Sequence, residues 1–371
     1  QRETGQMNEE IKKLPTPAVI VDLDIVEKNI MKMREGAKQF RLQHRPHIKT
    51  HRSTFLAKMQ MQAGCCGITV AKLGEAEVMV KAGIKDIFVA YPIIGEDKLK
   101  RLLKISRQAE VTTIVNSIKG AYQLNEYCEK NGEKIKVLIE IDGGLNRGGI
   151  KSGQAVLEYA RSIRNLKGIE IIGLMYYGGL VYGSHNKEEV KKYARQEREV
   201  LLTNAKMLED DGFCMKVLSA GSSFTGKVPE ELEGITEIRS GHYIFNDCGQ
   251  LDVGLAKEEE CALRVVSTIV SKPDKHVVIA DVGSKSLTSD RCHYRSGFGE
   301  IVGYPNIEIY ALNEEHAFLR SEEENPLQIG DKIEIIPNHA CVVTNLVEQV
   351  YGFRNGVFEQ MIEIDARGKS L

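Results

Sequence analysis

Three short segments of this 371-residue chain carry side chains able to do chemistry. Lys49 stands in His47-Ile48-Lys49-Thr50-His51, and its amine can form a Schiff base with a carbonyl compound. The run Ser219-Ala220-Gly221-Ser222-Ser223-Phe224-Thr225 offers hydroxyl and backbone N–H groups to an anion. In Pro337-Asn338-His339-Ala340-Cys341 an imidazole and a thiol stand two residues apart. On an extended strand both would share one face and could bind one cation.

The elements that must position these segments alternate between β-branched runs and stretches of helical period, from Ala18 to about residue 241. This alternation is typical of βα units and a parallel sheet. After an opening strand at 18–23, Asp24 is the predicted N-cap of a helix, with Glu27 in the capping-box position. Good helix formers follow at 96–107 and 187–211. Eight further strands are predicted at 45–48, 67–71, 86–91, 112–116, 136–142, 169–175, 216–220 and 236–240.

From about residue 256 the pattern changes to short strands joined by turns, with almost no helical period. The predicted strands lie at 262–270, 277–282, 307–311, 333–336 and 357–364, and Asn355-Gly356 predicts a hairpin. We therefore predict an α/β fold with two domains. Residues 20–255 form a closed (β/α)8 barrel. Residues 256–371 form an all-β domain, to which a strand from about 14–23 contributes.

The barrel prediction puts the reactive segments at one rim. In such barrels reactive groups lie at the C-terminal ends of strands, and phosphate sites form in the loops after the last two. Lys49 follows the first predicted strand, Ser219–Thr225 the seventh, and Ser240-Gly241-His242-Tyr243 the eighth. An amine and a phosphate cradle at one rim are what a pyridoxal 5'-phosphate (PLP) enzyme needs.

Composition excludes several other classes of function. The 50 Lys and Arg residues nearly balance the 52 Asp and Glu residues, so we expect no binding to nucleic acid or membrane surfaces. No apolar run approaches the ~20 residues of a membrane span. The eight cysteines form no CxxC motif, which excludes zinc-ribbon and thioredoxin-like sites. A chain of this length can bury a large core without disulfides, so we expect reduced thiols in a cytoplasmic protein. The six residues before Met7 are predicted to be unstructured.

The segment Arg45–His51, with Leu14–Ala18 upstream and Gly67–Glu77 downstream, resembles fold-type III PLP enzymes related to D-threonine aldolase and D-serine dehydratase. The resemblance covers nearly the whole chain, with matching runs at 142–148, 219–225, 281–290 and 337–346. It implies an alanine-racemase-like barrel with a β-domain, a homodimer, and an active site at the barrel mouth that the β-domain closes.

The resemblance also implies roles for single residues. Lys49 matches the lysine that binds the cofactor covalently, and Arg147 matches an arginine near the ring oxygen. Tyr177 falls beside the pyridine ring, although Tyr176-Tyr177-Gly178-Gly179-Leu180 departs from the family, which often has histidine where Leu180 stands. Tyr176 and Tyr177 therefore remain alternatives. The positions that match phosphate-binding residues are Ser222, Ser223, Thr225, Gly241 and Tyr243.

His339 and Cys341 match the metal ligands of the family. In the aldolase branch the second ligand is typically aspartate, and in the D-serine dehydratase branch it is cysteine. A thiolate favours Zn²⁺, whereas a carboxylate suits Mn²⁺ or Mg²⁺, so we expect Zn²⁺ with the other two as alternatives. Two protein ligands leave positions open for water and substrate.

These residues predict a PLP- and metal-dependent lyase for a small-molecule D-amino acid that carries a β-hydroxyl. The first expectation is D-serine dehydratase, which yields pyruvate and ammonia. D-threonine aldolase and 3-hydroxy-D-aspartate aldolase or dehydratase are alternatives, and only Cys341 discriminates among them. An amino-acid racemase would use Lys49 without His339 or Cys341. A PLP carrier would not need a β-domain.

Overall fold

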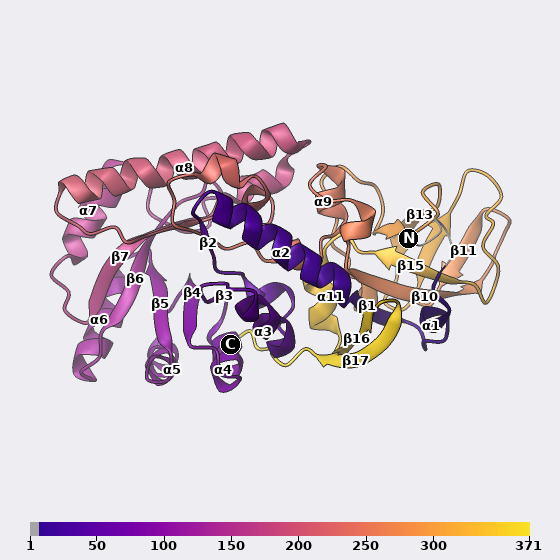
Figure 1. Cartoon of the computed structure of the whole chain (residues 1–371), viewed down its shortest axis with the longest axis horizontal. Helices are drawn as coiled ribbons and strands as arrows, with labels where there is room; N and C mark the ends of the chain where they lie inside the picture. The colour runs from indigo at the N-terminus through magenta and orange to yellow at the C-terminus, as the bar shows by residue number, and fades with distance from the viewer. Residues whose placement is uncertain (1–6) are drawn as a thin grey trace. The chain divides into compact units, whose positions relative to one another are not determined.

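The computed structural model describes residues 7–371, so the prediction for the six residues before Met7 falls outside it. The chain forms two compact units (Figure 1). The barrel unit consists of Met31–Lys49, Leu56–Gly241 and Gly368–Leu371. Among the described residues, the β unit consists of 7–30, Thr50–Phe55 and His242–Arg367. Within residues 7–371, no helix combines the length and apolar character needed to span a membrane.

Parallel strands form the frame of the barrel unit. They follow the order β2-β9-β8-β7-β6-β5-β4-β3 in one eight-stranded sheet. All neighbouring pairs in this order are parallel. The strands are β2 (Gln43–His44), β3 (Ile68–Val70), β4 (Asp86–Pro92), β5 (Glu110–Val115), β6 (Ile135–Ile141), β7 (Ile169–Tyr176), β8 (Val217–Ala220) and β9 (Glu237–Ile238).

The segment after β2 joins the two ends of this strand order. His47 forms an isolated parallel bridge with Thr69, beside β3. Thr69 N donates to Pro46 O at 2.8 Å. On the other side, Arg45 N donates to Ile238 O of β9 at 2.9 Å. The ring of strands is thereby closed, and the predicted (β/α)8 barrel with a second, mainly β domain is confirmed.

Helices follow the strands and surround them in Figure 1. Side-chain caps satisfy the free N–H groups at two helix starts: Ser117 accepts from Gly120 N at 3.2 Å, and Asn186 accepts from Glu189 N at 3.0 Å. The helices are α2 (Leu23–Gln39), α3 (Thr54–Gln62), α4 (Leu73–Lys81), α5 (Glu96–Ser106), α6 (Ile118–Lys130), α7 (Gln154–Ile163) and α8 (Lys187–Asp210).

The predicted cap of the first long helix is wrong by two residues. Helix α2 begins at Leu23, and Asp22 accepts from Ile25 N at 3.1 Å, so Asp22 performs the capping. Asp24 lies in the first turn and accepts instead from Asn355 N at 2.6 Å. Sequence alone favoured Asp24 because Asp22 continues the apolar run of the opening strand.

Antiparallel strand pairing dominates the β unit. Its nine-stranded sheet has the order β13-β14-β11-β10-β1-β16-β17, with β15 beside β10 and β12 beside β15. The strands are β1 (Ala18–Asp22), β10 (Leu263–Ser271), β11 (Val277–Ala280), β12 (Glu300–Ile301), β13 (Glu308–Leu312), β14 (Ala317–Arg320), β15 (Lys332–Ile336), β16 (Gln349–Arg354) and β17 (Val357–Glu363).

The N-terminal strand is central to this sheet. In β1, Ala18 pairs antiparallel with Val266 of β10, and Ile20 pairs parallel with Tyr351 of β16. The hairpin of β16 and β17 turns at Asn355 and Gly356, whose φ values of 49° and 75° suit a tight hairpin turn. A strand near the start of the chain thus bridges elements more than two hundred residues away.

Two local predictions near the chemistry are wrong. Residues 45–48 do not form a strand: β2 ends at His44, and Ile48–Thr50 forms a 3-10 turn, η1. The β unit also contains short helices, α9 (Cys248–Asp252), α10 (Ser284–Leu287) and α11 (Ala340–Leu346). In both places hydrogen bonds to distant segments override the local alternation of apolar residues.

A glycine in β7 makes close strand pairing possible. A Cβ at Gly173 would lie 1.8 Å from Val217 O of β8. We expect Gly173→Ala to lower the free energy of unfolding by about 3 kcal/mol, because the strands must separate. Gly183→Ala is the matched control, since a methyl there meets no atom within 4 Å. Chemical denaturation measures both, and equal stability of the two variants would contradict the close pairing.

Candidate functional site

Lys49 lies in η1, and its side chain is exposed. Its backbone N lies 3.4 Å from His47 Nδ1. His47 N in turn donates to Ser240 O at 3.2 Å, just after β9. These contacts place Lys49 at the rim where β9 ends.

The loop after β8 is a folded cradle. Ser222 Oγ accepts from the backbone N of Phe224 and of Thr225, both at 3.1 Å. Thr225 Oγ1 accepts from Ser222 N at 2.8 Å. Gly221 starts the loop with a φ of 80°, and a Cβ there would meet the Ile238 side chain at 2.7 Å. This loop therefore needs glycine at its first position.

A hydrogen bond joins the two loops that contain predicted phosphate-binding residues. Gly241 N donates to Ser223 Oγ at 2.9 Å, which joins the end of β9 to the loop that contains Ser222 and Thr225. Tyr243 is 1% exposed and lies in the 3-10 turn η5 (His242–Ile244), in the β unit. Because His47 is bonded to Ser240, Lys49 and this loop lie at the same end of the strands.

Arg147 and Tyr177 also lie together. The guanidinium carbon of Arg147 is 4.7 Å from the centroid of the Tyr177 ring, a cation–π distance. Tyr176 ends β7 and is 4% exposed, whereas Tyr177 follows the strand and is half-buried. The contact with Arg147 favours Tyr177 as the ring-side residue of the two.

The geometry predicted for His339 and Cys341 is wrong in one respect. His339 is extended but is the N-cap residue of α11, and Cys341 lies in the first turn of that helix. They are therefore not on one face of a strand. Their side chains still interact, because the charge of Cys341 raises the pKa of His339 to about 11, against the effect of burial.

Sequence reasoning missed Asp247, which holds this pair in place. Asp247 Oδ2 lies 3.5 Å from His339 Nδ1 and accepts from Ala340 N at 3.1 Å. Burial would raise the pKa of Asp247, but the charges of His242 and His339 hold it below its ordinary value. With Nδ1 facing a carboxylate, Nε2 of His339 is the nitrogen available to a cation.

Cys341 has a partner of its own, since its Sγ donates to Thr50 Oγ1 at 3.2 Å. Residues 7–371 contain no group of three or more His, Cys, Asp or Glu side chains able to hold a metal ion. The site of two protein ligands at His339 and Cys341 therefore stays a prediction, and two ligands would suit a catalytic rather than a structural site.

Two buried charged residues beneath the rim were also missed. Arg239 donates to Ser219 Oγ at 2.6 Å and to Tyr176 O at 2.9 Å, so it ties β9 to β8 and β7. Glu197 of α8 accepts from the loop after β8. Glu197 could have been found, because it lies on the same helical stripe as the buried Ala194 and Leu201.

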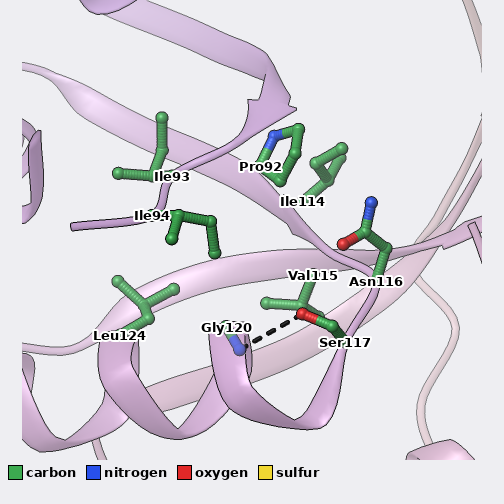
Figure 2. Close-up of a pocket in the computed structure, with 9 residues that line it drawn as sticks. All are labelled: Pro92, Ile93, Ile94, Ile114, Val115, Asn116, Ser117, Gly120 and Leu124. Atoms are coloured by element: carbon green, nitrogen blue, oxygen red, sulfur yellow. Dashed lines mark hydrogen bonds between the residues drawn. The ribbon is translucent and has the colours of Figure 1, made fainter. Parts of the chain in front are cut away.

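A small hollow elsewhere in the barrel unit does not contain these residues. Figure 2 shows it at the ends of β4 and β5, with the Ser117 cap of α6 at one side. Its walls are mostly apolar, and none of the predicted site residues lines it. The residues that line the hollow are Pro92, Ile93, Ile94, Ile114, Val115, Asn116, Ser117, Gly120 and Leu124.

Comparison with known families places these segments. Residues 21–248 match the model described as "Alanine racemase, N-terminal domain". Residues 262–353, which contain His339 and Cys341, match the "Putative serine dehydratase domain". A D-threonine aldolase from Arthrobacter sp is 30% identical over 99% of this chain and 96% of its own length. The chain belongs to this enzyme family, that of D-threonine aldolase and D-serine dehydratase.

Other family members include lyases of both reaction types. A D-serine dehydratase from Dictyostelium discoideum is 28% identical and covers 95% of this chain and 96% of its own. The structure of a D-threo-3-hydroxyaspartate dehydratase from Delftia sp. HT23 has a TM-score of 0.89 at 28% identity, over 96% of this chain and 99% of that one. Like these relatives, the chain is a lyase.

Two further structures, both described as D-threo-3-hydroxyaspartate dehydratase, concern a histidine and a cysteine two positions apart. Each is replaced by alanine in one of the structures, and the cysteine variant is described as metal-free. In the present chain, His339 and Cys341 have the same spacing.

A buried histidine anchors the strand that leads to Lys49. His44 Nε2 lies 3.3 Å from Ser240 O, and burial lowers the pKa of His44 to about 4. Below pH ~6.5 His44 is protonated in the unfolded chain, whereas in the folded chain it stays neutral until the pH approaches its lowered pKa. We expect this difference to remove about 3 kcal/mol of stability as the pH falls from ~6.5 to ~4.

The measurement is denaturation at several pH values for wild type and His44→Gln. The variant should lose less stability in acid than wild type does. His316→Gln, at an exposed histidine, is the control and should keep the wild-type slope. An unchanged slope in His44→Gln would show that His44 does not titrate as described.

Proposed function

We propose that this lyase uses PLP and a metal ion to remove water from a β-hydroxy D-amino acid, with D-serine as substrate and pyruvate and ammonia as products. The pairing of Cys341 with His339 carries the proposal. A cysteine at this position matches the dehydratase pattern, whereas the aldolase pattern has aspartate. We further propose a cytoplasmic homodimer, in keeping with its eight free cysteines and the family resemblance.

The residues at the barrel rim have the chemistry that PLP requires. Lys49 would hold the cofactor through its amine, and Arg147 with Tyr177 would contact the ring. Ser222, Ser223 and Thr225, together with Gly241 and Tyr243, would hold the phosphate by hydroxyl and N–H groups. When bound, PLP supplies an electron sink for negative charge at the substrate α-carbon. Lys49 is then the proposed base that removes the α-proton.

His339 and Cys341 have the chemistry that Zn²⁺ requires. Asp247 occupies Nδ1 of His339, which directs Nε2 toward a metal and fixes the ring. The thiolate of Cys341 favours Zn²⁺ over Mn²⁺ and Mg²⁺. Zn²⁺ on these side chains would supply a Lewis acid for departure of the β-hydroxyl.

Dehydration of 3-hydroxy-D-aspartate is the second candidate. It is favoured by the histidine and cysteine two positions apart in the structures described as D-threo-3-hydroxyaspartate dehydratase. Aldol cleavage would instead use the metal to help deprotonate the hydroxyl, with glycine and an aldehyde as products. A racemase would need neither His339 nor Cys341.

One assay separates these reactions. The purified protein is incubated with PLP, Zn²⁺ and, in turn, D-serine, D-threonine and 3-hydroxy-D-aspartate, and 2-oxo acid and glycine are measured separately. We expect 2-oxo acid, and its loss when a chelator removes the metal. Glycine as the main product would instead establish the aldolase, and chelator-resistant racemisation would overturn the lyase reaction proposed here.

Replacement of Lys49 tests the covalent link to PLP. We expect Lys49→Ala to lose the visible absorbance of the bound cofactor and at least 10²-fold in dehydration rate, because the base is removed. Lys58→Ala, at an exposed lysine of α3, is the control and should keep both. Retention of the absorbance band in Lys49→Ala would refute the assignment.

Replacement of Cys341 tests the proposed discriminator. Cys341→Asp should bind Zn²⁺ at least tenfold more weakly and release less pyruvate from D-serine, because a carboxylate is a harder ligand. Cys214→Asp, at an exposed cysteine, serves as control. Metal content by atomic absorption is the direct measurement, and wild-type zinc content with a wild-type rate would exclude Cys341 as a ligand.

A further inference from the structure

Glu197 is a buried carboxylate to which neither the sequence nor the proposed reaction assigns a role. It lies on α8 and is 1% exposed. The buried residues one turn away on the same face of α8 are small or apolar, namely Ala194 and Leu201. A carboxylate at such a position costs stability unless its surroundings hold it.

Glu197 is bonded to both ends of the proposed phosphate loop. Its Oε2 accepts from Gly221 N at 3.1 Å and from Thr225 Oγ1 at 3.1 Å. Its Oε1 is fully buried and has no hydrogen-bond partner among the described residues. A Cβ on Gly178 would lie 2.7 Å from this oxygen, so Gly178 is the residue that leaves room for it.

The hydrogen bond from Thr225 to Glu197 restricts what Thr225 can do. The hydroxyl has one hydrogen, which it gives to Glu197, and its oxygen already accepts from Ser222 N at 2.8 Å. While Glu197 is ionised, Thr225 cannot donate to an anion in the loop. The ionised carboxylate also repels such an anion.

A proton on Glu197 removes both obstacles. Neutral Glu197 can donate from Oε2 to Thr225 Oγ1, and the hydroxyl hydrogen of Thr225 then becomes available to an anion. This reversal of the hydrogen bond between Glu197 and Thr225 needs one proton from solvent and only a rotation of the Thr225 hydroxyl. We propose that Glu197 is a positioning residue for the cofactor phosphate, and that it takes up a proton when the phosphate binds. This inference rests on the proposed PLP site.

The charges around Glu197 are compatible with proton uptake near neutral pH. Burial raises the pKa of Glu197 to about 7, although Thr225, Gly221 and the Arg239 guanidinium act in the other direction. The phenols of Tyr176 and Tyr177 also face it from the end of β7. The acidic groups of the neighbouring turn η4 (Pro229–Leu232) pair elsewhere, Glu230 with Lys191 and Glu231 with Arg195.

The test compares binding of PLP with binding of pyridoxal, which lacks the phosphate, to cofactor-free protein between pH 6 and 8.5. In wild type, PLP affinity should fall up to ~10-fold per pH unit above ~7, beyond any fall seen in Glu197→Gln, since one proton is linked to binding. For pyridoxal, the pH profiles of the two proteins should be parallel. Glu199→Gln, at an exposed position of α8, should behave as wild type.

Calorimetry on wild type alone gives a second measurement that needs no variant. At pH 8, in two buffers of different ionisation enthalpy, the protein should take up about one proton more on binding PLP than on binding pyridoxal. Equal proton uptake, or an identical PLP profile in Glu197→Gln, would overturn the role of Glu197 while leaving the PLP site intact. Failure to bind either compound would overturn the proposed PLP site itself.

Discussion

The closing of the strand ring is the constraint on which the rest of the barrel unit depends. The three residues after β2 bond to β9 on one side and to β3 on the other. Arg45 reinforces the seam, because its side chain donates to Glu237 at 2.9 Å and to Asp86 at 2.5 Å. Lys49 directly follows this seam, so the same bonds that close the ring also fix where the amine can stand.

The chain passes from one unit to the other at the peptide bond between Lys49 and Thr50. Within the β unit, Thr50 accepts from Cys341 Sγ through its hydroxyl and from Thr344 Oγ1 through its carbonyl, at 3.2 and 2.6 Å. The proposed cofactor lysine is therefore covalently joined to the residue that contacts the proposed metal thiolate. A shift at Thr50 would act on both chemical groups.

Much of the fold could be predicted from the sequence, because strands such as β6 and β7 and the hairpin at Asn355-Gly356 follow local patterns. The segment 45–48 could not, since its hydrogen bonds run to residues far along the chain. In the candidate site, Glu197 was visible as a charge on an apolar stripe. Asp247 was not, because its bond to Ala340 spans 93 positions and nothing local indicates it.

The place of β1 has a consequence for synthesis on the ribosome. The partners of this strand lie much further along the chain and extend to Phe353 of β16. At about 5–20 residues per second, its apolar residues wait roughly 20 to 70 s for those partners. The βα units of the barrel can form in order during that time. Until those partners are made, the nascent chain presents an unpaired apolar strand, which makes Ala18–Val21 a natural segment for a chaperone to cover.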